Sequence, residues 1–319
     1  MFKCTDEIKS PRTAYGNTLV DIGAKNKDIV VLDADLSCST QTCMFAKAYP
    51  DRFFNVGIAE QDLMGTAAGL ATVGKTPFVS TFAMFATARC LDQIRNSICY
   101  SNLNVKIVAT HGGVTVGEDG ASHQALEDVA YMRAIPDMTV IVPADYTEVE
   151  QVIKYAANTY GPMYIRISRT NLKTIFDEKT YNFSPDKAVK IQEGADVTIV
   201  TNGETLIEVI DCAQMLKNVG IEADVLHIPV IKPFGAQKDV ISSALKTKKV
   251  VTVENHSIIG GLGSLVCETL SEHCPTQTLR IGTNDVFGQS GEQRALMEHY
   301  GLTGEKLFGR VMQFLGKTK

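Results

Sequence analysis

Short apolar runs alternate with longer amphipathic segments along nearly the whole chain. In the first half the apolar runs predict buried strands at Ile29–Asp33, Pro77–Ser80, Val105–Thr110, Thr139–Val142 and Met163–Ile167. The segments between them predict helices at Ile58–Val73, Ala83–Tyr100, His123–Ala134 and Tyr146–Thr159. Strands that alternate with helices in this way indicate a parallel sheet with helices on both faces.

A polar stretch, Lys173–Lys190, interrupts the pattern and is predicted to connect two domains. Beyond it the alternation resumes. Strands are expected at Val197–Thr201, Ala223–His227, Lys249–Glu254 and Gln277–Ile281, and helices at Thr205–Val219, Lys238–Leu245, Leu262–Cys274, Gly291–Tyr300 and Gly304–Leu315. We therefore predict an α/β fold with two doubly wound domains, at residues 1–180 and 190–319.

Composition narrows the possible functions. The 319 residues are 45% hydrophobic and 21% charged, which is typical of a soluble globular protein. A net charge of −5 without a long basic run argues against binding to nucleic acid or to an anionic membrane surface. No apolar stretch reaches transmembrane length, and the amino terminus lacks an apolar signal core. The eight cysteines form no CxxC pair, so we expect free thiols in a cytoplasmic protein.

The segment Phe53–Ala71, FFNVGIAEQDLMGTAAGLA, holds the most specific pattern, because Glu60 opens a helix of small residues. A carboxylate there has an ordinary explanation, since the helix dipole favours negative charge in the first turn. Gly57 and Glu60, however, resemble the GxxE signature of thiamine-diphosphate enzymes, and more specifically the pyrimidine-binding half of transketolase and its relatives. The resemblance implies that Glu60 binds the N1′ nitrogen of the cofactor and is catalytic.

The segment Thr110–Gln124, THGGVTVGEDGASHQ, follows a predicted strand, where ligands bind in open α/β sheets. Its two histidines and acidic residues also allow a zinc interpretation, but zinc needs three or four ligands and the remaining histidines are distant in sequence. The segment resembles the transketolase substrate loop. That resemblance implies that His111 lies near the substrate phosphate, that Asp119 contacts a sugar hydroxyl, and that His123 contacts hydroxyls of the two-carbon donor.

Further segments match the same family. The sequence STFAMF, residues 80–85, resembles a segment whose aromatic residues line the aminopyrimidine pocket, so Phe82 and Phe85 are candidates, although core packing would also explain them. The positions that bind the sugar phosphate are matched by Arg169 and, with less similar surroundings, by Arg12 and Ser39. Two arginines suit a phosphate because each guanidinium presents a fork of donors, whereas the alternative for each is a solvated surface arginine.

The sequences VTVENHSIIGGLGSLV and DVFGQSGEQRALMEHYGL resemble the smaller C-terminal domain of the family. The glycines of Gly260–Ser264 precede a predicted helix, but the Walker lysine is missing and Val266 replaces the third glycine of a dinucleotide fingerprint. We therefore predict a tight turn between strand and helix, not a phosphate loop. We expect this domain to serve assembly more than chemistry.

The GDG sequence of the family's magnesium-binding half does not occur in this chain. The resemblance therefore implies that thiamine diphosphate and Mg²⁺ are cofactors, with the metal ligands on a separate N-terminal subunit. It further implies a heterotetramer of two copies of each subunit, inactive without the partner. The complete enzyme would transfer a two-carbon ketol unit between sugar phosphates, as in the pentose phosphate pathway.

Alternatives remain within and beyond this class. Gln61 is more typical of deoxyxylulose-phosphate synthase and of 2-oxo acid dehydrogenase β subunits, whereas GEDGASHQ favours transketolase. Ala88, beside Arg89, replaces an aromatic residue found in many transketolases, so the stacking of the pyrimidine is not determined. A non-catalytic assembly subunit would retain the same fold. The sequence does not identify the sugars, nor whether they carry a phosphate or a sulfonate.

Overall fold

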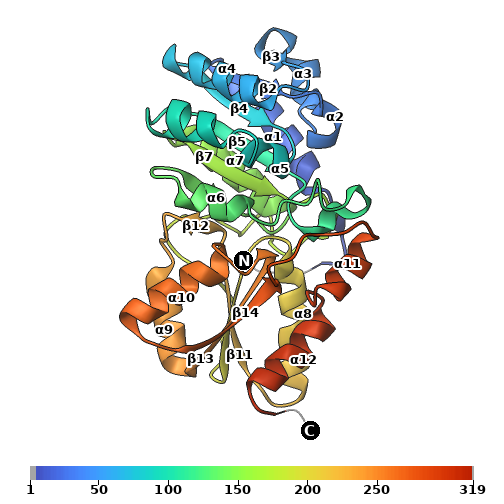
Figure 1. Ribbon diagram of the computed structural model, residues 1–319, viewed down its shortest axis with the longest axis vertical. Coiled ribbons are helices and arrows are strands. Elements are labelled where there is room, and N and C mark those ends of the chain that lie inside the picture. Colours follow the sequence, from blue (N-terminus) through green and yellow to red (C-terminus); the bar gives the residue numbers. More distant parts are fainter. Residues whose placement is uncertain (1–4, 318–319) are drawn as a thin grey trace.

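The computed structural model describes residues 5–317 of the chain. Two α/β units are stacked along the longest axis of the molecule (Figure 1). The first contains a seven-stranded sheet with strand order β12-β6-β7-β5-β4-β2-β3, and the second contains a five-stranded sheet with strand order β14-β13-β10-β11-β9. The predicted fold class is confirmed.

The first sheet is parallel except at one edge. Its parallel strands are β2 (Ile29–Asp33), β3 (Phe53–Asn55), β4 (Thr76–Ser80), β5 (Lys106–Thr110), β6 (Thr139–Ile141) and β7 (Met163–Ile167). The edge strand β12 (Val230–Lys232) comes from far along the chain and pairs antiparallel with β6. All residues of β2, β4, β5 and β7 are buried, as expected for strands covered on both faces.

Helices cover both faces of this sheet. One face carries α1 (Pro11–Lys25), α3 (Cys43–Ala48) and α7 (Tyr146–Asn158), and the other carries α4 (Glu60–Thr72), α5 (Ala83–Thr87), the π-helix η2 (Gln93–Cys99) and α6 (Asp128–Ala134). Successive residues of β2 point to opposite faces, so Val31 packs among the first group and Leu32 among the second. Short elements complete the unit: α2 (Ser37–Thr40), the 3₁₀ turns η1 (Pro50–Arg52) and η3 (Val114–Asp119), and the paired strands β1 (Ile8–Lys9) and β8 (Leu172–Lys173).

The second unit repeats the layered design. The strands β10 (Val197–Thr201), β11 (Ala223–His227), β13 (Lys249–Ser257) and β14 (Gln277–Thr283) are parallel, and β9 (Val189–Gln192) is antiparallel. Figure 1 shows α8 (Thr205–Asn218) and α12 (Gly304–Phe314) on one side of the sheet, with α9 (Gln237–Thr247) and α10 (Leu262–His273) on the other. The helix α11 (Gln293–His299) packs against η3 of the first unit.

Two predicted helices are wrong in part. The segment Ala83–Tyr100 is not one helix, because α5 ends at Thr87 and the chain continues into a π-helix. The segment His123–Ala134 is helical only from Asp128, because its first residues belong to the loop after η3. The helix α1 was not predicted.

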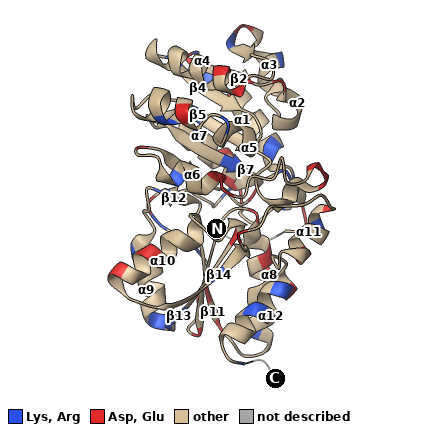
Figure 2. Cartoon of the chain, viewed as in Figure 1, with Lys and Arg blue, Asp and Glu red and all other residues tan. Residues whose placement is uncertain are grey.

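Within residues 5–317, no helix is both long and apolar enough to cross a membrane. Acidic and basic residues are interspersed along both units (Figure 2).

Candidate active site

Neighbouring parallel strands bring the candidate residues together at the carboxyl ends of the strands of the first sheet. The residues that follow the carboxyl ends of β7, β5, β4, β2 and β3 are, in that spatial order, Arg169, His111, Phe82, Ser39 and Glu60. Arg12 lies in the first turn of α1, and its side chain reaches Ser39 in the short helix α2 that follows β2. Because these strands are parallel, their carboxyl ends form a single row, and residues separated by up to 157 positions become neighbours.

Glu60 begins helix α4 and is only 4% exposed. Its Oε2 accepts a hydrogen bond from Nη1 of Arg89 at 2.8 Å, which also makes the contact an ion pair. Within residues 5–317, Oε1 accepts no hydrogen bond. A buried carboxylate with one oxygen still able to accept is suited to contact a ligand at the start of the helix.

Arg89 contacts the candidate residue Glu60, and the sequence did not indicate this contact. Its guanidinium lies over the Phe85 ring, 4.5 Å from the ring centre, while its backbone oxygen accepts from Nε2 of Gln61 at 3.0 Å. Arg89 therefore links the acidic residue to the aromatic pair. Arg89 and Glu60 are 29 positions apart, and nothing in that spacing indicates a contact between them.

The two aromatic residues and the two histidines of the segment Thr110–Gln124 form one cluster. Phe82 stacks on the imidazole of His111, with ring centres 3.9 Å apart, and lies 5.9 Å from the ring centre of Phe85. His123 meets Phe85 edge to face at 5.1 Å. The structure thus joins the residues expected at the pyrimidine to the residues expected at the substrate.

His111 is buried, and its backbone has a positive φ of 61°. Burial, followed by the positive charges of Arg12 and Arg169 and the proximity of His123, lowers the pKa of His111 to about 3. Its Nδ1 lies 2.7 Å from Oγ1 of Thr110. The imidazole is therefore neutral near pH 7, and if Nδ1 accepts from the Thr110 hydroxyl, Nε2 is left as a donor.

Two arginines flank this histidine. Nη1 of Arg12 donates to the backbone oxygen of Ser39 at 2.9 Å, and its buried Nε has no hydrogen-bond partner among the described residues. Burial, and then the charge of Arg169, lower the pKa of Arg12. Arg169 donates to the backbone oxygen of Val116 and, at 2.8 Å, to Oδ2 of Asp119. Two guanidinium groups that repel each other beside a neutral imidazole are an arrangement that an anion would stabilise.

The structure unites all the predicted site residues, but it gives two of them contacts that were not expected. Asp119 pairs with Arg169. Ser39 contributes its backbone oxygen, and its hydroxyl makes no hydrogen bond within residues 5–317. In the same part of the chain, no group of three or more histidine, cysteine, aspartate or glutamate side chains is arranged to hold a metal ion.

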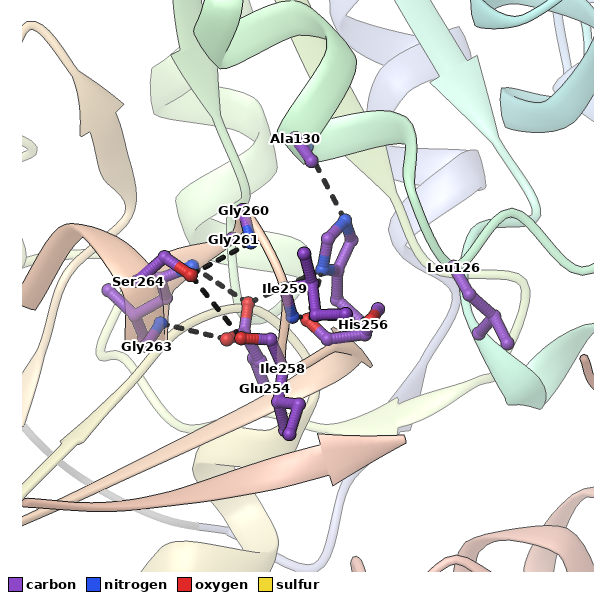
Figure 3. Close-up of polar contacts among 12 residues, drawn as sticks. Leu126, Ala130, Glu254, His256, Ile258, Ile259, Gly260, Gly261, Gly263 and Ser264 are labelled. Carbon is purple, nitrogen blue, oxygen red and sulfur yellow. Dashed lines mark hydrogen bonds and ion pairs between the residues drawn. The ribbon is translucent and has the colours of Figure 1, made fainter. Parts of the chain in front are cut away.

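The glycines between β13 and α10 form a strand-to-helix turn, as predicted. The Glu254 carboxylate accepts hydrogen bonds from the backbone N–H groups of Leu262 and Gly263, both at 2.8 Å. Figure 3 shows this side chain directed at the turn, with His256 reaching toward Ala130 of the first unit. The start of α10, where a phosphate would bind, is thus occupied by a carboxylate of the chain itself.

Comparison with known proteins agrees with this geometry. Residues 9–174 match the family model described as the transketolase pyrimidine-binding domain, and residues 186–307 match the transketolase C-terminal domain. A proposed transketolase C-terminal section of Methanocaldococcus jannaschii is 48% identical over 99% of this chain and its own full length. A 6-deoxy-6-sulfo-D-fructose transketolase subunit of Clostridium sp. is 40% identical over 93% of this chain and 91% of its own.

A solved structure of similar length supports the same assignment. It is a split-gene transketolase, described as an inactive beta4 tetramer, that is 50% identical and superposes with a TM-score of 0.89 over 98% of this chain and all of its own. Both family models, the two relatives and this structure agree over nearly the whole sequence. The chain therefore belongs to the transketolase family and contains its pyrimidine-binding and C-terminal domains.

Proposed function

We propose that this chain is the C-terminal subunit of a split transketolase and transfers a two-carbon ketol unit between sugar phosphates together with a separate N-terminal subunit. The observation that carries the proposal is the buried Glu60 carboxylate at the same sheet edge as an aromatic pair and two arginines. The Clostridium relative is named as a transketolase subunit, and the solved neighbour as a split-gene transketolase. We assign residues 1–180 and 190–319 to the two domains.

The residues present fit thiamine diphosphate, the cofactor of the family. Glu60 has an oxygen available for a ring nitrogen, and Phe82 and Phe85 supply an apolar surface for the aminopyrimidine. The cofactor supplies the carbon nucleophile that receives the ketol unit. Glu60 would hold the cofactor at a ring nitrogen and share a proton there, and burial of the carboxylate would keep water away from that contact.

The anion site fits the terminal phosphate of the sugar. Arg12 and Arg169 provide positive charge, and a neutral His111 donates one hydrogen bond. Asp119 and His123 are assigned to sugar hydroxyls, which both donate and accept. Guanidinium groups also bind a sulfonate, and the name of the Clostridium relative includes a sulfo-sugar. We therefore assign the site to a sugar with an anionic end, a phosphate or a sulfonate.

The partner completes the site in this proposal. The chain has no GDG sequence, so we assign the Mg²⁺ ligands to the N-terminal subunit and expect two copies of each subunit. The solved neighbour is described as an inactive tetramer of one kind of subunit, which is consistent with a need for the partner. All seven cysteines within the described residues are free, which supports a place in the reducing cytoplasm.

Reconstitution tests the proposal. Ketol transfer from xylulose 5-phosphate to ribose 5-phosphate is measured with this chain, the N-terminal subunit, thiamine diphosphate and Mg²⁺, and each component is omitted in turn. We expect activity only in the complete mixture. Release of CO₂ from pyruvate would instead favour a deoxyxylulose-phosphate synthase-like half or a 2-oxo acid dehydrogenase β subunit. Full activity of a Glu60→Ala variant with the partner would favour a non-catalytic assembly subunit.

A further inference from the structure

We infer that Glu204, in the second α/β unit, is a positioning residue that fixes residues 112–119, the first part of the loop between His111 and His123, against Arg169. The inference rests on the proposed function for its meaning in catalysis. It gives the C-terminal domain a part in substrate binding beyond assembly. Glu204 does not touch the anion site and acts through the residues that form it.

The carboxylate of Glu204 joins three segments of the chain. Oε1 accepts hydrogen bonds from Oγ1 of Thr115, at 2.7 Å, and from Nδ2 of Asn255. Oε2 accepts from the hydroxyl of Ser168. Glu204 is only 9% exposed and stands at the N-cap of α8, yet its side chain makes no capping hydrogen bond to that helix. A buried acidic side chain that leaves its own helix uncapped is directed at the loop instead.

Asn255, at the end of β13, reinforces the same contact. Its Oδ1 accepts from the backbone N–H of Val114 at 2.9 Å, and its Nδ2 also lies 3.2 Å from Oγ1 of Thr115. Gly113 has φ +78°, and a Cβ atom at this position would overlap the Asn255 amide. The loop backbone at Gly113 therefore rests directly on the Asn255 side chain of the second unit, where a side chain on residue 113 would not fit.

The hydrogen bonds of Glu204 hold the segment that contains Arg169 and also the loop that Arg169 contacts. Thr115 directly precedes Val116, whose backbone oxygen accepts from the Arg169 guanidinium, and Ser168 directly precedes Arg169 itself. One carboxylate thus fixes both the arginine and the loop that orients it. Because Glu204 accepts all three hydrogen bonds as a carboxylate, a glutamine removes the negative charge that strengthens them, and its N–H₂ group faces Ser168 only if that hydroxyl turns from donor to acceptor.

The test compares Glu204→Gln with Glu208→Gln in the reconstituted complex. Glu208 is also a buried acidic residue of α8, but among residues 5–317 its carboxylate bonds only Arg294 and the backbone N–H of Gly304, both within the second unit. We expect Glu204→Gln to raise KM for xylulose 5-phosphate about tenfold with little change in kcat, and Glu208→Gln to leave both unchanged. Kinetics with erythrulose, a ketose without phosphate, should be the same in both variants. Equal KM values for xylulose 5-phosphate in wild type and Glu204→Gln would overturn the inference.

A second measurement separates this inference from the proposed function. Hydrogen exchange of the backbone amides of residues 113–119 is followed in the full chain, where we expect at least tenfold faster exchange in Glu204→Gln than in Glu208→Gln. If the wild-type complex transfers no ketol unit, the proposed function fails, and the role of Glu204 is then tested by the hydrogen-exchange rates alone. Unchanged exchange would then overturn it. Should Glu204→Gln fail to fold, Ser168→Ala removes one of the three bonds and takes its place in both assays.

Discussion

The Arg89 guanidinium and the Glu60 carboxylate form an ion pair in which the two partners differ sharply in exposure. The N–O distance is 2.8 Å, and the side chain of Glu60 is 4% exposed whereas that of Arg89 is 47% exposed. The carboxylate is thus buried beside a counterion that remains half in water. Because Arg89 lies at the surface, it can move away at small cost when a ligand approaches Glu60.

Replacing Glu60 with glutamine should reduce ketol transfer by the complex at least about 100-fold, because an amide cannot share a proton with the cofactor ring as a carboxyl does. Asp62→Asn is the matched control, since Asp62 also lies in the first turn of α4 but is exposed. We expect the control to retain activity and both variants to assemble with the partner, as judged by size-exclusion chromatography. A Glu60→Gln complex with wild-type kcat would refute the catalytic assignment.

The Glu60–Arg89 pair should show a measurable coupling energy. In a double-mutant cycle of Glu60→Gln, Arg89→Ala and the double variant, urea unfolding should give a coupling of about 1 kcal/mol, because one partner is buried and the other half-exposed. Arg95→Ala serves as the control, since Arg95 is exposed on η2 and, in the part of the chain that the structure describes, its side chain bonds only its neighbour Asn96. Strict additivity of the two single changes would contradict the ion pair.

His111 should make stability depend on acidity. Its pKa is about 3 in the folded chain against 6.5 for an ordinary histidine, so between these values the unfolded chain binds the extra proton. Its contribution is complete above the unfolded value and is lost as pH falls, by about 2 kcal/mol from pH 7 to pH 5. His111→Asn removes the titrating group, and asparagine tolerates the positive φ of this position. Urea unfolding at both pH values should show a smaller loss in the variant. An equal loss of stability in the wild type and the variant would show that a group other than His111 titrates.

Lys106 should produce a second effect, at higher pH. Its side chain is fully buried, Nζ donates to the backbone oxygens of Thr159 and Gly161, and burial lowers its pKa from 10.5 to about 7. Between these values the folded chain has lost a proton that the unfolded chain keeps, so stability rises with pH, by about 2 kcal/mol from pH 7 to pH 9. Lys106→Met keeps the volume of the side chain and should abolish this rise in urea unfolding. A rise that persists in the variant would show that Lys106 is not its source.

The strands could be predicted from sequence because fully buried strands give short, continuous apolar runs. The observed bounds of β2, β7, β10 and β11 are those predicted. Helix α1 could not be predicted, because Gly16 and Gly23 within it are typical of a loop. In the structure these glycines allow α3 to approach, and a Cβ atom on Gly16 would lie 2.6 Å from Sδ of Met44. A tertiary contact therefore outweighs the low helix propensity.

The residues of the candidate site could be predicted only where they belong to a motif within one segment of the sequence. Glu60 and His111 lie in motifs, and their assigned roles stay predictions. Glu204 gave no such signal, because an acidic residue before a helix is an ordinary N-cap and its contact with Thr115 spans 89 positions. The contact of Arg89 with Glu60 could not be predicted either, because the two residues are 29 positions apart. Contacts of this kind depend on how loops from two sheets meet, and no pattern within one segment contains that information.

The edge strand β12 determines how this polypeptide can be divided in the laboratory. It comes from beyond residue 190, yet it pairs with β6, and Nζ of Lys232 donates to the backbone oxygens of Arg133 and Ile135. A fragment ending at residue 180 would therefore expose the unpaired edge of β6, which favours aggregation. The complementary fragment would contain β12 without the strand it pairs with. The two domains recognised in the sequence are thus a single unit for expression and refolding.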